Sequence, residues 1–222
     1  MIPSSTGSSA AAIVPAAGAS TRMGRPKLLL PWGGSTVLES TLAALRDGGV
    51  PRIVVVLAPQ SPLEEWQPPD GVRTALNPEP SSGMLSSVFV GLAALATAVE
   101  GASRAEGTGH VLEHGDALAP VPDPLLVCPA DLPALRPSTV AALLAAYREH
   151  GGVVVPRHGR RRGHPLLISP HWQARMPEIA HHDRGLRRIL ELAAGAVHEL
   201  PVDDPGCIHD VDTPEEYARL AP

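Results

Sequence analysis

Residues 13–30, IVPAAGASTRMGRPKLLL, decide how the rest of this 222-residue chain is interpreted. A short apolar segment leads into a loop rich in glycine and alanine, and the cations Arg22, Arg25 and Lys27 follow closely. In parallel α/β proteins such a loop brings backbone N–H groups up to a phosphate, because small residues let a ligand approach the main chain. The stretch therefore predicts a strand followed by a polyphosphate-binding loop.

Lys27 is the only lysine among the 18 lysine and arginine residues of the chain. An ammonium is a compact charge that fits between phosphate oxygens, whereas a guanidinium is a planar fork. The use of lysine at this one position indicates a chemical role at a phosphate. A solvated surface lysine is the simpler interpretation, and the sequence alone leaves it open.

The length and composition fit one α/β domain and argue against several classes of partner. Hydrophobic residues make up 44% of the chain and aromatic residues 3%, so the core must be built from Ala, Val, Leu and Ile. The net charge of −5 argues against a nucleic-acid partner, since such proteins carry clustered basic residues over a large face. The sequence contains neither a membrane-length apolar run nor a secretory signal pattern at its start, so we expect a cytoplasmic protein without a membrane partner.

Strand and helix patterns alternate along the chain. Runs of mainly apolar residues predict strands at residues 10–15, 52–58, 125–128 and 151–156, and two more polar segments, at residues 72–76 and 197–202, are further strand candidates. Apolar residues at helical spacing and capping residues predict helices at residues 37–46, 81–99, 137–150 and 183–194, and from Thr213 onward. This order predicts one domain over residues 1–222, a Rossmann-like three-layer α/β/α sandwich with a mostly parallel sheet. We expect residues 1–9 to be disordered and residues 101–123 to form a surface insertion.

Two aspartates are candidates for binding a metal ion. Asp131 directly follows an apolar strand, and ligands bind where the strands of an open α/β sheet end. A carboxylate there suits Mg²⁺, which takes one or two carboxylates plus phosphate oxygens. A turn or helix cap is the alternative interpretation. Near the C-terminus, Asp210 and Asp212 alternate in an extended segment before a helix, so they face the same side.

Several other polar groups have two interpretations each. Asn77, the only asparagine, ends a strand, where it either binds a nucleobase or ribose or forms a turn before Pro78. The basic run at residues 157–164 is either a solvated hairpin tip or a set of donors for a phosphate on a second substrate. Two different metal sites also stay open, although neither has the spacing of a catalytic zinc site. They are built from His209, Asp210 and Asp212, or from His181, His182 and Asp183.

The loop resembles the opening loop of the MobA-like nucleotidyltransferases, A-A-G-x-S-x-R-M-G followed by x-P-K. The two alanines before the glycine make it most similar to the MocA branch, the molybdenum cofactor cytidylyltransferases. The resemblance extends over residues 16–217 and implies the fold of the nucleotide-diphospho-sugar transferases. It also implies Mg²⁺-dependent transfer of CMP from CTP to a phosphorylated acceptor, molybdopterin or its molybdenum complex, with release of pyrophosphate. A molybdenum hydroxylase would be the client of the product.

The resemblance also assigns roles to individual residues. Those implied to bind the nucleotide are Ala16, Ala17, Gly18, Ser20, Arg22, Gly24, Lys27, Asn77, Ser82 and Gly83. Arg22, Lys27 and Asp131 would be catalytic, and Asp131 and Asp212 would hold the metal. The acceptor would meet Arg162 and His164, from an R-R-x-G-H-P match, and Asp183 and Arg187, from a shorter match. The chain departs from the family at Leu85, where a smaller residue is usual.

Two other functions are compatible with the sequence. One is a related MobA-like transferase that uses GTP or another nucleoside triphosphate on a sugar phosphate or alcohol phosphate. The other is a non-catalytic accessory protein that binds the cofactor and delivers it to a molybdenum enzyme. The presence of Lys27, Asp131 and Asp212 favours an enzyme over such a carrier.

Overall fold

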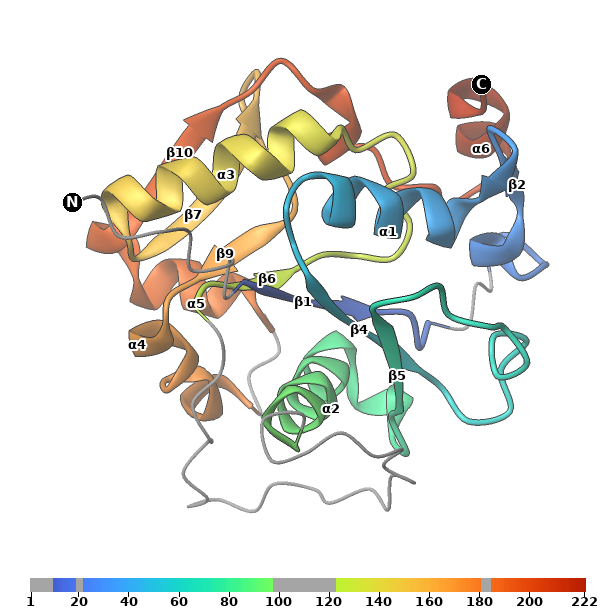
Figure 1. Cartoon of the computed structure of the whole chain (residues 1–222), viewed down its shortest axis with the longest axis horizontal. Helices are drawn as coiled ribbons and strands as arrows, with labels where there is room; N and C mark the ends of the chain where they lie inside the picture. Colours follow the sequence, from blue (N-terminus) through green and yellow to red (C-terminus); the bar gives the residue numbers. More distant parts are fainter. Residues whose placement is uncertain (1–9, 19–21, 98–122, 181–184) are drawn as a thin grey trace.

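The computed structural model describes residues 10–18, 22–97, 123–180 and 185–222 (Figure 1). The strands of its main sheet are β1 (Ala11–Pro15), β4 (Arg52–Leu57), β5 (Val72–Leu76), β6 (Leu125–Val127), β7 (Val153–His158), β8 (Arg161–Arg162), β9 (Leu166–Ile168) and β10 (Val197–Pro201). A small hairpin is formed by β2 (Pro31–Trp32) and β3 (Ser35–Thr36). The α-helices are α1 (Val37–Asp47), α2 (Met84–Thr97), α3 (Pro137–His150), α4 (Pro170–Gln173), α5 (Arg187–Leu192) and α6 (Pro214–Leu220). The 3-10 helices are η1 (Lys27–Leu29), η2 (Pro80–Ser82), η3 (Met176–Ile179), η4 (Ala194–Ala196) and η5 (Pro205–Cys207).

The eight-stranded sheet has the order β10-β7-β9-β6-β1-β4-β5, and β8 pairs with β7. β1 pairs in parallel with both β4 and β6, and β5 continues the parallel arrangement beside β4. β9 is antiparallel to its neighbours β6 and β7. The predicted mostly parallel sheet is therefore confirmed, and β9 and β8 are its antiparallel exceptions.

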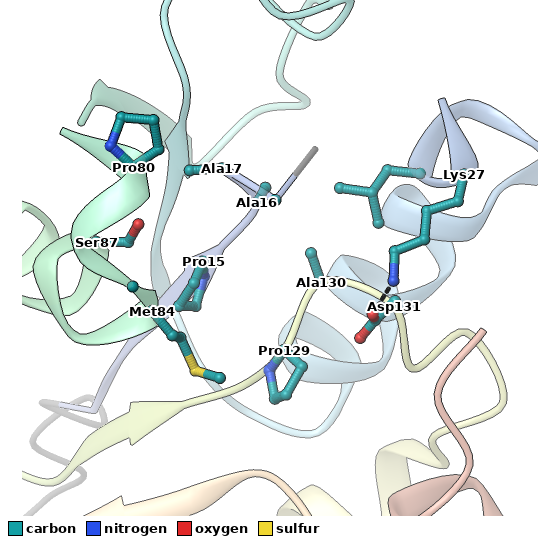
Figure 2. Close-up of a pocket in the computed structure, with 13 residues that line it drawn as sticks. Pro15, Ala16, Ala17, Lys27, Pro80, Met84, Ser87, Pro129, Ala130 and Asp131 are labelled. Atoms are coloured by element: carbon teal, nitrogen blue, oxygen red, sulfur yellow. Dashed lines mark hydrogen bonds and ion pairs between the residues drawn. The ribbon is translucent and has the colours of Figure 1, made fainter. Parts of the chain in front are cut away.

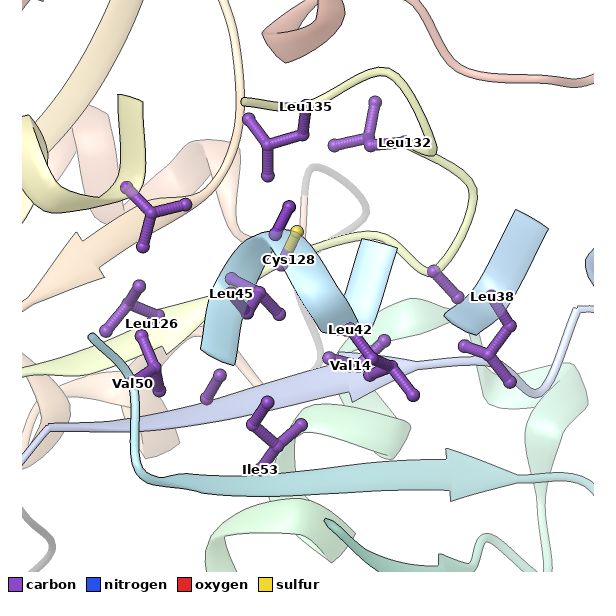
Figure 3. Close-up of a cluster of buried hydrophobic side chains, with 14 of the residues drawn as sticks. Val14, Leu38, Leu42, Leu45, Val50, Ile53, Leu126, Cys128, Leu132 and Leu135 are labelled. Atoms are coloured by element: carbon purple, nitrogen blue, oxygen red, sulfur yellow. The ribbon is translucent and has the colours of Figure 1, made fainter. Parts of the chain in front are cut away.

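Helices cover both faces of the sheet and make the predicted three layers (Figure 1). α1 and α3 lie on one face, over a buried cluster that includes Val14, Leu42 and Leu143. Figure 3 shows side chains of α1 gathered above β1 and β4 in this layer. α2, α4 and α5 lie on the other face, over a cluster that includes Ile13 and Val88. Because the central strands β1, β4 and β6 are covered on both sides, their residues are nearly all apolar and buried.

Local signals in the sequence set most helix ends. Thr36 and Glu39 form a capping box at the start of α1, and Thr213 and Glu216 form another at the start of α6. Pro137 opens α3, which ends before Gly151, at a φ of 63°. The predicted helix at 137–150 and the strand at 72–76 have the predicted bounds.

The structure corrects two helix starts. α2 begins at Met84 rather than residue 81, because residues 80–82 form a 3-10 turn and Gly83 adopts a φ of 93°. α5 begins at Arg187 rather than residue 183. The predictions for residues 1–9 and for nearly all of residues 101–123 lie outside the described residues. In the described parts of the chain, no helix combines the length and apolar character needed to span a membrane.

The contact between α2 and β1 gives a test of this packing. A Cβ on Gly91 would lie 2.6 Å from Cγ2 of Ile13, a side chain with no exposed surface. We expect Gly91→Ala to lower the free energy of unfolding by about 1–3 kcal/mol in urea denaturation, although alanine favours helix. The added methyl group must displace Ile13 or the helix. Gly195→Ala is the control, because a Cβ there meets no atom within 4 Å.

A double-mutant cycle sharpens the test. Ile13→Ala alone should cost about 2–5 kcal/mol through the cavity it leaves. In the double variant the new methyl group occupies part of that space, so the combined cost should fall below the sum of the two single costs. Strict additivity, or a Gly91→Ala variant as stable as the wild type, would show that α2 is not seated this closely on β1.

Candidate active site

A cavity of about 230 Å³ opens at the carboxyl ends of β1 and β6, beside the start of α2 (Figure 2). Parallel neighbouring strands end at the same edge of a sheet, so the loops after β1 and β6 meet there. The residues that line the cavity come from these loops, η1, η2 and α2. They are Pro15, Ala16, Ala17, Gly18, Lys27, Leu28, Pro80, Gly83, Met84, Ser87, Pro129, Ala130 and Asp131.

The loop after β1 forms one wall of the cavity. The main-chain N–H of Ala16 donates to the Val56 carbonyl at 2.8 Å, which extends the β1–β4 pairing into the start of the loop. Gly24, at a φ of 67°, reverses the chain before η1. Leu28 of η1 is buried, and it anchors the turn that carries Lys27. Of the predicted loop residues, Ala16, Ala17, Gly18 and Lys27 line the cavity, while Ser20 lies outside the described residues.

Lys27 joins the two predicted metal ligands. Its Nζ lies 2.5 Å from Oδ2 of Asp131 and 2.6 Å from Oδ1 of Asp212. Nη2 of Arg22 lies 2.6 Å from the other oxygen of Asp212. The segment that carries Asp212 is held beside Asp131 by a hydrogen bond from the Val211 N–H to the Asp131 carbonyl, at 3.0 Å. Arg22, Lys27, Asp131 and Asp212, selected from the sequence, thus form one connected cluster.

Burial and charge act differently on each member of this cluster. Burial opposes the charged form of Lys27, but the ion pairs with Asp131 and Asp212 outweigh it and raise the lysine pKa. Burial raises the pKa of Asp131, and its ion pair with Lys27 only partly opposes this effect. For Asp212, burial is outweighed by Lys27 and Arg22, which lower its pKa. Asp131, the more buried carboxylate, therefore has less compensating positive charge around it than Asp212 has.

The two aspartates fit a divalent cation that also binds a substrate. Oδ1 of Asp131 is buried and has no hydrogen-bond partner among the described residues, and this is the kind of oxygen that a cation satisfies. Within the same described ranges, no three His, Cys, Asp or Glu side chains come together as a metal site. The set of His209, Asp210 and Asp212 is therefore not assembled, and the set of residues 181–183 lies outside the described residues. Two carboxylates completed by phosphate oxygens match the preference of Mg²⁺.

Asn77 lies outside the cavity lining and hydrogen-bonds to Ser87, which lines the cavity. Its side chain is 1% exposed, and its Nδ2 donates to Oγ of Ser86 at 2.8 Å and of Ser87 at 3.0 Å. Its Oδ1 accepts from the Glu79 N–H at 3.0 Å. Asn77 is thus committed to the loop and helix start at residues 79–87 and is absent from the cavity lining. We therefore assign it a positioning role, in place of the predicted contact with the base or ribose.

The sequence analysis missed several residues on this side of the cavity. Pro80, Met84 and Ser87 line it, and Gly83 does so as predicted, whereas Ser82 is exposed and does not. Ser87 could have been found from its spacing, because it lies one helical turn after Gly83, which directly precedes α2. Met84 gave no such signal, because an apolar residue at a helix start is usually part of a core.

The predicted acceptor residues lie in two places. Nε and Nη2 of Arg162 donate to Oε1 of Glu199 on β10, at 2.8 and 2.5 Å. His164 lies deeper, where its main-chain N–H donates to the Cys207 carbonyl at 2.8 Å and its Nδ1 is buried without a partner among the described residues. Burial lowers the pKa of His164, Arg187 adds to this effect, and Asp210 opposes it. Arg187 is thus near enough to His164 to act on its pKa, whereas Arg162 pairs with Glu199, and Asp183 lies outside the described residues.

Comparison with known proteins places this site in a family. The MobA-like NTP transferase domain matches residues 12–200. The chain is 30% identical to nicotine blue oxidoreductase of Paenarthrobacter nicotinovorans, over 92% of this chain and 93% of the relative. It is 25% identical to the molybdenum cofactor cytidylyltransferase of Escherichia coli strain K12, over 92% of both chains.

Solved structures agree with this placement. Rv0371c from Mycobacterium tuberculosis H37Rv is 26% identical and superposes with a TM-score of 0.71, covering 97% of this chain and 98% of Rv0371c. Its complex with manganese is 25% identical with a TM-score of 0.65, covering 96% and 97% of the two chains. With a family match over most of its length and a cavity bounded by the family's loop, this chain belongs to the MobA-like NTP transferases.

Proposed function

We propose that this protein transfers CMP from CTP to a phosphorylated acceptor, molybdopterin or its molybdenum complex, and releases pyrophosphate. The observation that carries the proposal is the position of Lys27 between Asp131 and Asp212, beside the loop at residues 15–18. This arrangement combines donors for a polyphosphate with two carboxylates for a metal ion. The similarity to a molybdenum cofactor cytidylyltransferase over 92% of the chain supports the choice of nucleotide and acceptor.

In the proposed reaction, an acceptor phosphate oxygen attacks the α-phosphorus of CTP, and the bond from that phosphorus to the bridging oxygen of pyrophosphate breaks. The backbone N–H groups of Ala17 and Gly18 hold the triphosphate, and Lys27 and Arg22 neutralise charge on it and on the departing pyrophosphate. Asp131 and Asp212 would hold Mg²⁺, and the ion would supply further charge neutralisation on the phosphate oxygens. The protein forms no covalent bond to the substrate, so positioning and electrostatics account for the acceleration.

The shape of the cavity supports a nucleotide whose phosphates lie near Lys27 and whose base lies on the opposite side. Lys27 and Asp131 lie on one side of it, and Pro15, Pro80 and Met84 lie on the other (Figure 2). A base placed beside Ser87 and Gly83 would rest on these apolar side chains and leave its phosphates near Lys27. The acceptor would then approach from the side of His164 and Arg187.

A second candidate function is a redox reaction, which the 30% identity to nicotine blue oxidoreductase favours. A dinucleotide redox cofactor also carries phosphates, so the loop at residues 16–18 and Lys27 suit either ligand. A redox reaction alone gives no reason for Asp131 and Asp212 to converge on one ammonium. We therefore rank nucleotidyl transfer first and include the redox reaction among the outcomes of the test.

The test measures pyrophosphate release with Mg²⁺, CTP or GTP, and either molybdopterin, its molybdenum complex or a sugar phosphate. We expect release with CTP and the pterin acceptor. Asp131→Asn should reduce the rate by about 10²–10³-fold, because one metal ligand and one charge are lost. Asp47→Asn is the matched control, since Asp47 is an exposed aspartate whose ion-pair partner in the described part of the chain is the neighbouring Arg46.

Other results would replace the proposal. Turnover with GTP or a sugar phosphate would assign a related transferase. Oxidation of a reduced nicotinamide dinucleotide without pyrophosphate release would assign the redox function. Tight binding of the pterin without any turnover, unchanged by Asp131→Asn, would indicate a carrier protein.

The ion-pair cluster also predicts how stability depends on pH. In the wild type, Lys27 and Arg22 lower the pKa of Asp212, so Asp212 stabilises the fold above its unfolded pKa of about 3.9 and less so as the pH falls. In Lys27→Met the two carboxylates lose their shared cation, so the pKa of Asp131, already raised by burial, should rise further, and the pKa of Asp212 should rise from its lowered value. Stability in the variant should then fall as the pH rises through the raised pKa of Asp131.

We therefore expect Lys27→Met to lose roughly 2–3 kcal/mol relative to the wild type at about pH 7, and clearly less at about pH 4. Urea unfolding at the two pH values measures the difference. Arg46→Met removes an exposed arginine that pairs with the neighbouring Asp47, and it should show no such trend. Equal losses at both pH values would mean that Lys27 stabilises the fold by packing and not by charge.

A further inference from the structure

The cation-binding oxygens of the site are already occupied by side chains. Lys27 contacts one oxygen of Asp131 and one of Asp212, and Arg22 contacts the second oxygen of Asp212. Only Oδ1 of Asp131 lacks a partner among the described residues. The cluster is therefore two carboxylates facing two side-chain cations, in the place where the proposed function requires a metal ion.

A free divalent cation must compete with Lys27 and Arg22 for the carboxylates of Asp131 and Asp212. It needs the same carboxylate oxygens that Lys27 and Arg22 contact, and it brings two positive charges close to both side chains. To bind there, it must displace the Lys27 ammonium, whose side chain is only 14% exposed, from both of its partners. Without another anion nearby, the displaced ammonium would stay in a partly buried site without its counter-charges.

A triphosphate removes this obstacle. Lys27 also lines the cavity with Ala16, Ala17 and Gly18, so phosphates bound at that loop would lie within reach of its ammonium. The Arg22 side chain is 70% exposed and is free to turn to the same phosphates. Phosphate oxygens then pair with both cations, while the carboxylates become available to a metal ion that the phosphates also bind.

We propose that Lys27, assisted by Arg22, determines which form of the metal the site accepts: the metal–nucleotide complex and not the free ion. This proposal rests on the proposed nucleotide and metal site and adds a specificity-determining role for the lysine. Nucleotide and metal binding are then positively coupled. The nucleotide raises the affinity for the metal ion by the same factor by which the metal ion raises the affinity for the nucleotide. The opposing account is that Lys27 only holds the two aspartates in place, in which case its loss weakens metal binding.

The two accounts predict opposite effects of the same substitution. The probe is Mn²⁺, whose binding to the full-length protein without nucleotide is measured by electron paramagnetic resonance. We expect Lys27→Met to bind free Mn²⁺ at least 10-fold more tightly than the wild type does. Lys27→Arg, which keeps the charge, should bind it as weakly as the wild type. Arg46→Met removes a cation remote from the cavity and should have no effect.

Two further measurements make the result decisive. Asp131→Asn introduced into Lys27→Met should abolish the gain, which shows that the tighter Mn²⁺ occupies this site. In the wild type, CTP affinity should rise at least 10-fold when Mn²⁺ is present, and in Lys27→Met this rise should shrink. If Lys27→Met does not fold, Lys27→Gln replaces it, because glutamine is neutral and still donates hydrogen bonds to the carboxylates.

Free Mn²⁺ binding that is unchanged or weaker in Lys27→Met or Lys27→Gln would overturn the inference. The assay contains no acceptor and requires no turnover. A wrong acceptor or a failed transfer reaction therefore leaves its outcome intact, whereas failure of the inference alone leaves pyrophosphate release intact.

Discussion

The convergence of two carboxylates on one ammonium is the constraint around which this structure is arranged. Lys27 pairs with Asp131, 104 residues away in the sequence, and with Asp212, 185 residues away. No local secondary structure brings these residues together, so the fold as a whole must do so. The apolar layers that pack β1 and β6 side by side are therefore also what builds the site.

Three structural devices hold the charged groups in place. β1 and β6 end at the same edge of the sheet and place the loop and Asp131 side by side. The Val211–Asp131 main-chain hydrogen bond brings the C-terminal segment to that edge, and the capping box at Thr213 starts α6 directly after Asp212. Tyr217 of α6 donates to the Pro31 carbonyl at 2.5 Å, which ties α6 to the chain that follows η1. None of these devices uses the charged groups of Arg22, Lys27, Asp131 or Asp212, so the position of the cluster does not depend on its own ion pairs.

The sequence predicted the parts of the structure that depend on local patterns. The strands and the long helices follow apolar periodicity and caps. Arg22 and Lys27 follow from the loop motif and Asp131 from its position at a strand end, whereas Asp212 was selected through the family resemblance. The antiparallel direction of β9 was not predictable, because a three-residue apolar strand reads the same in both directions. The roles of Asn77 and Arg162 were not predictable either, because they depend on hydrogen-bond partners that only the fold reveals. Asn77 pairs with Ser86 and Ser87, and Arg162 pairs with Glu199.

The most direct test of this account is a crystal structure with Mn²⁺ and a non-hydrolysable CTP analogue. The account predicts anomalous Mn²⁺ density between Asp131 and Asp212, the triphosphate against the backbone of residues 16–18, and the Lys27 ammonium moved onto phosphate oxygens. A metal bound elsewhere, or a nucleotide bound while Lys27 still bridges the two aspartates, would contradict it.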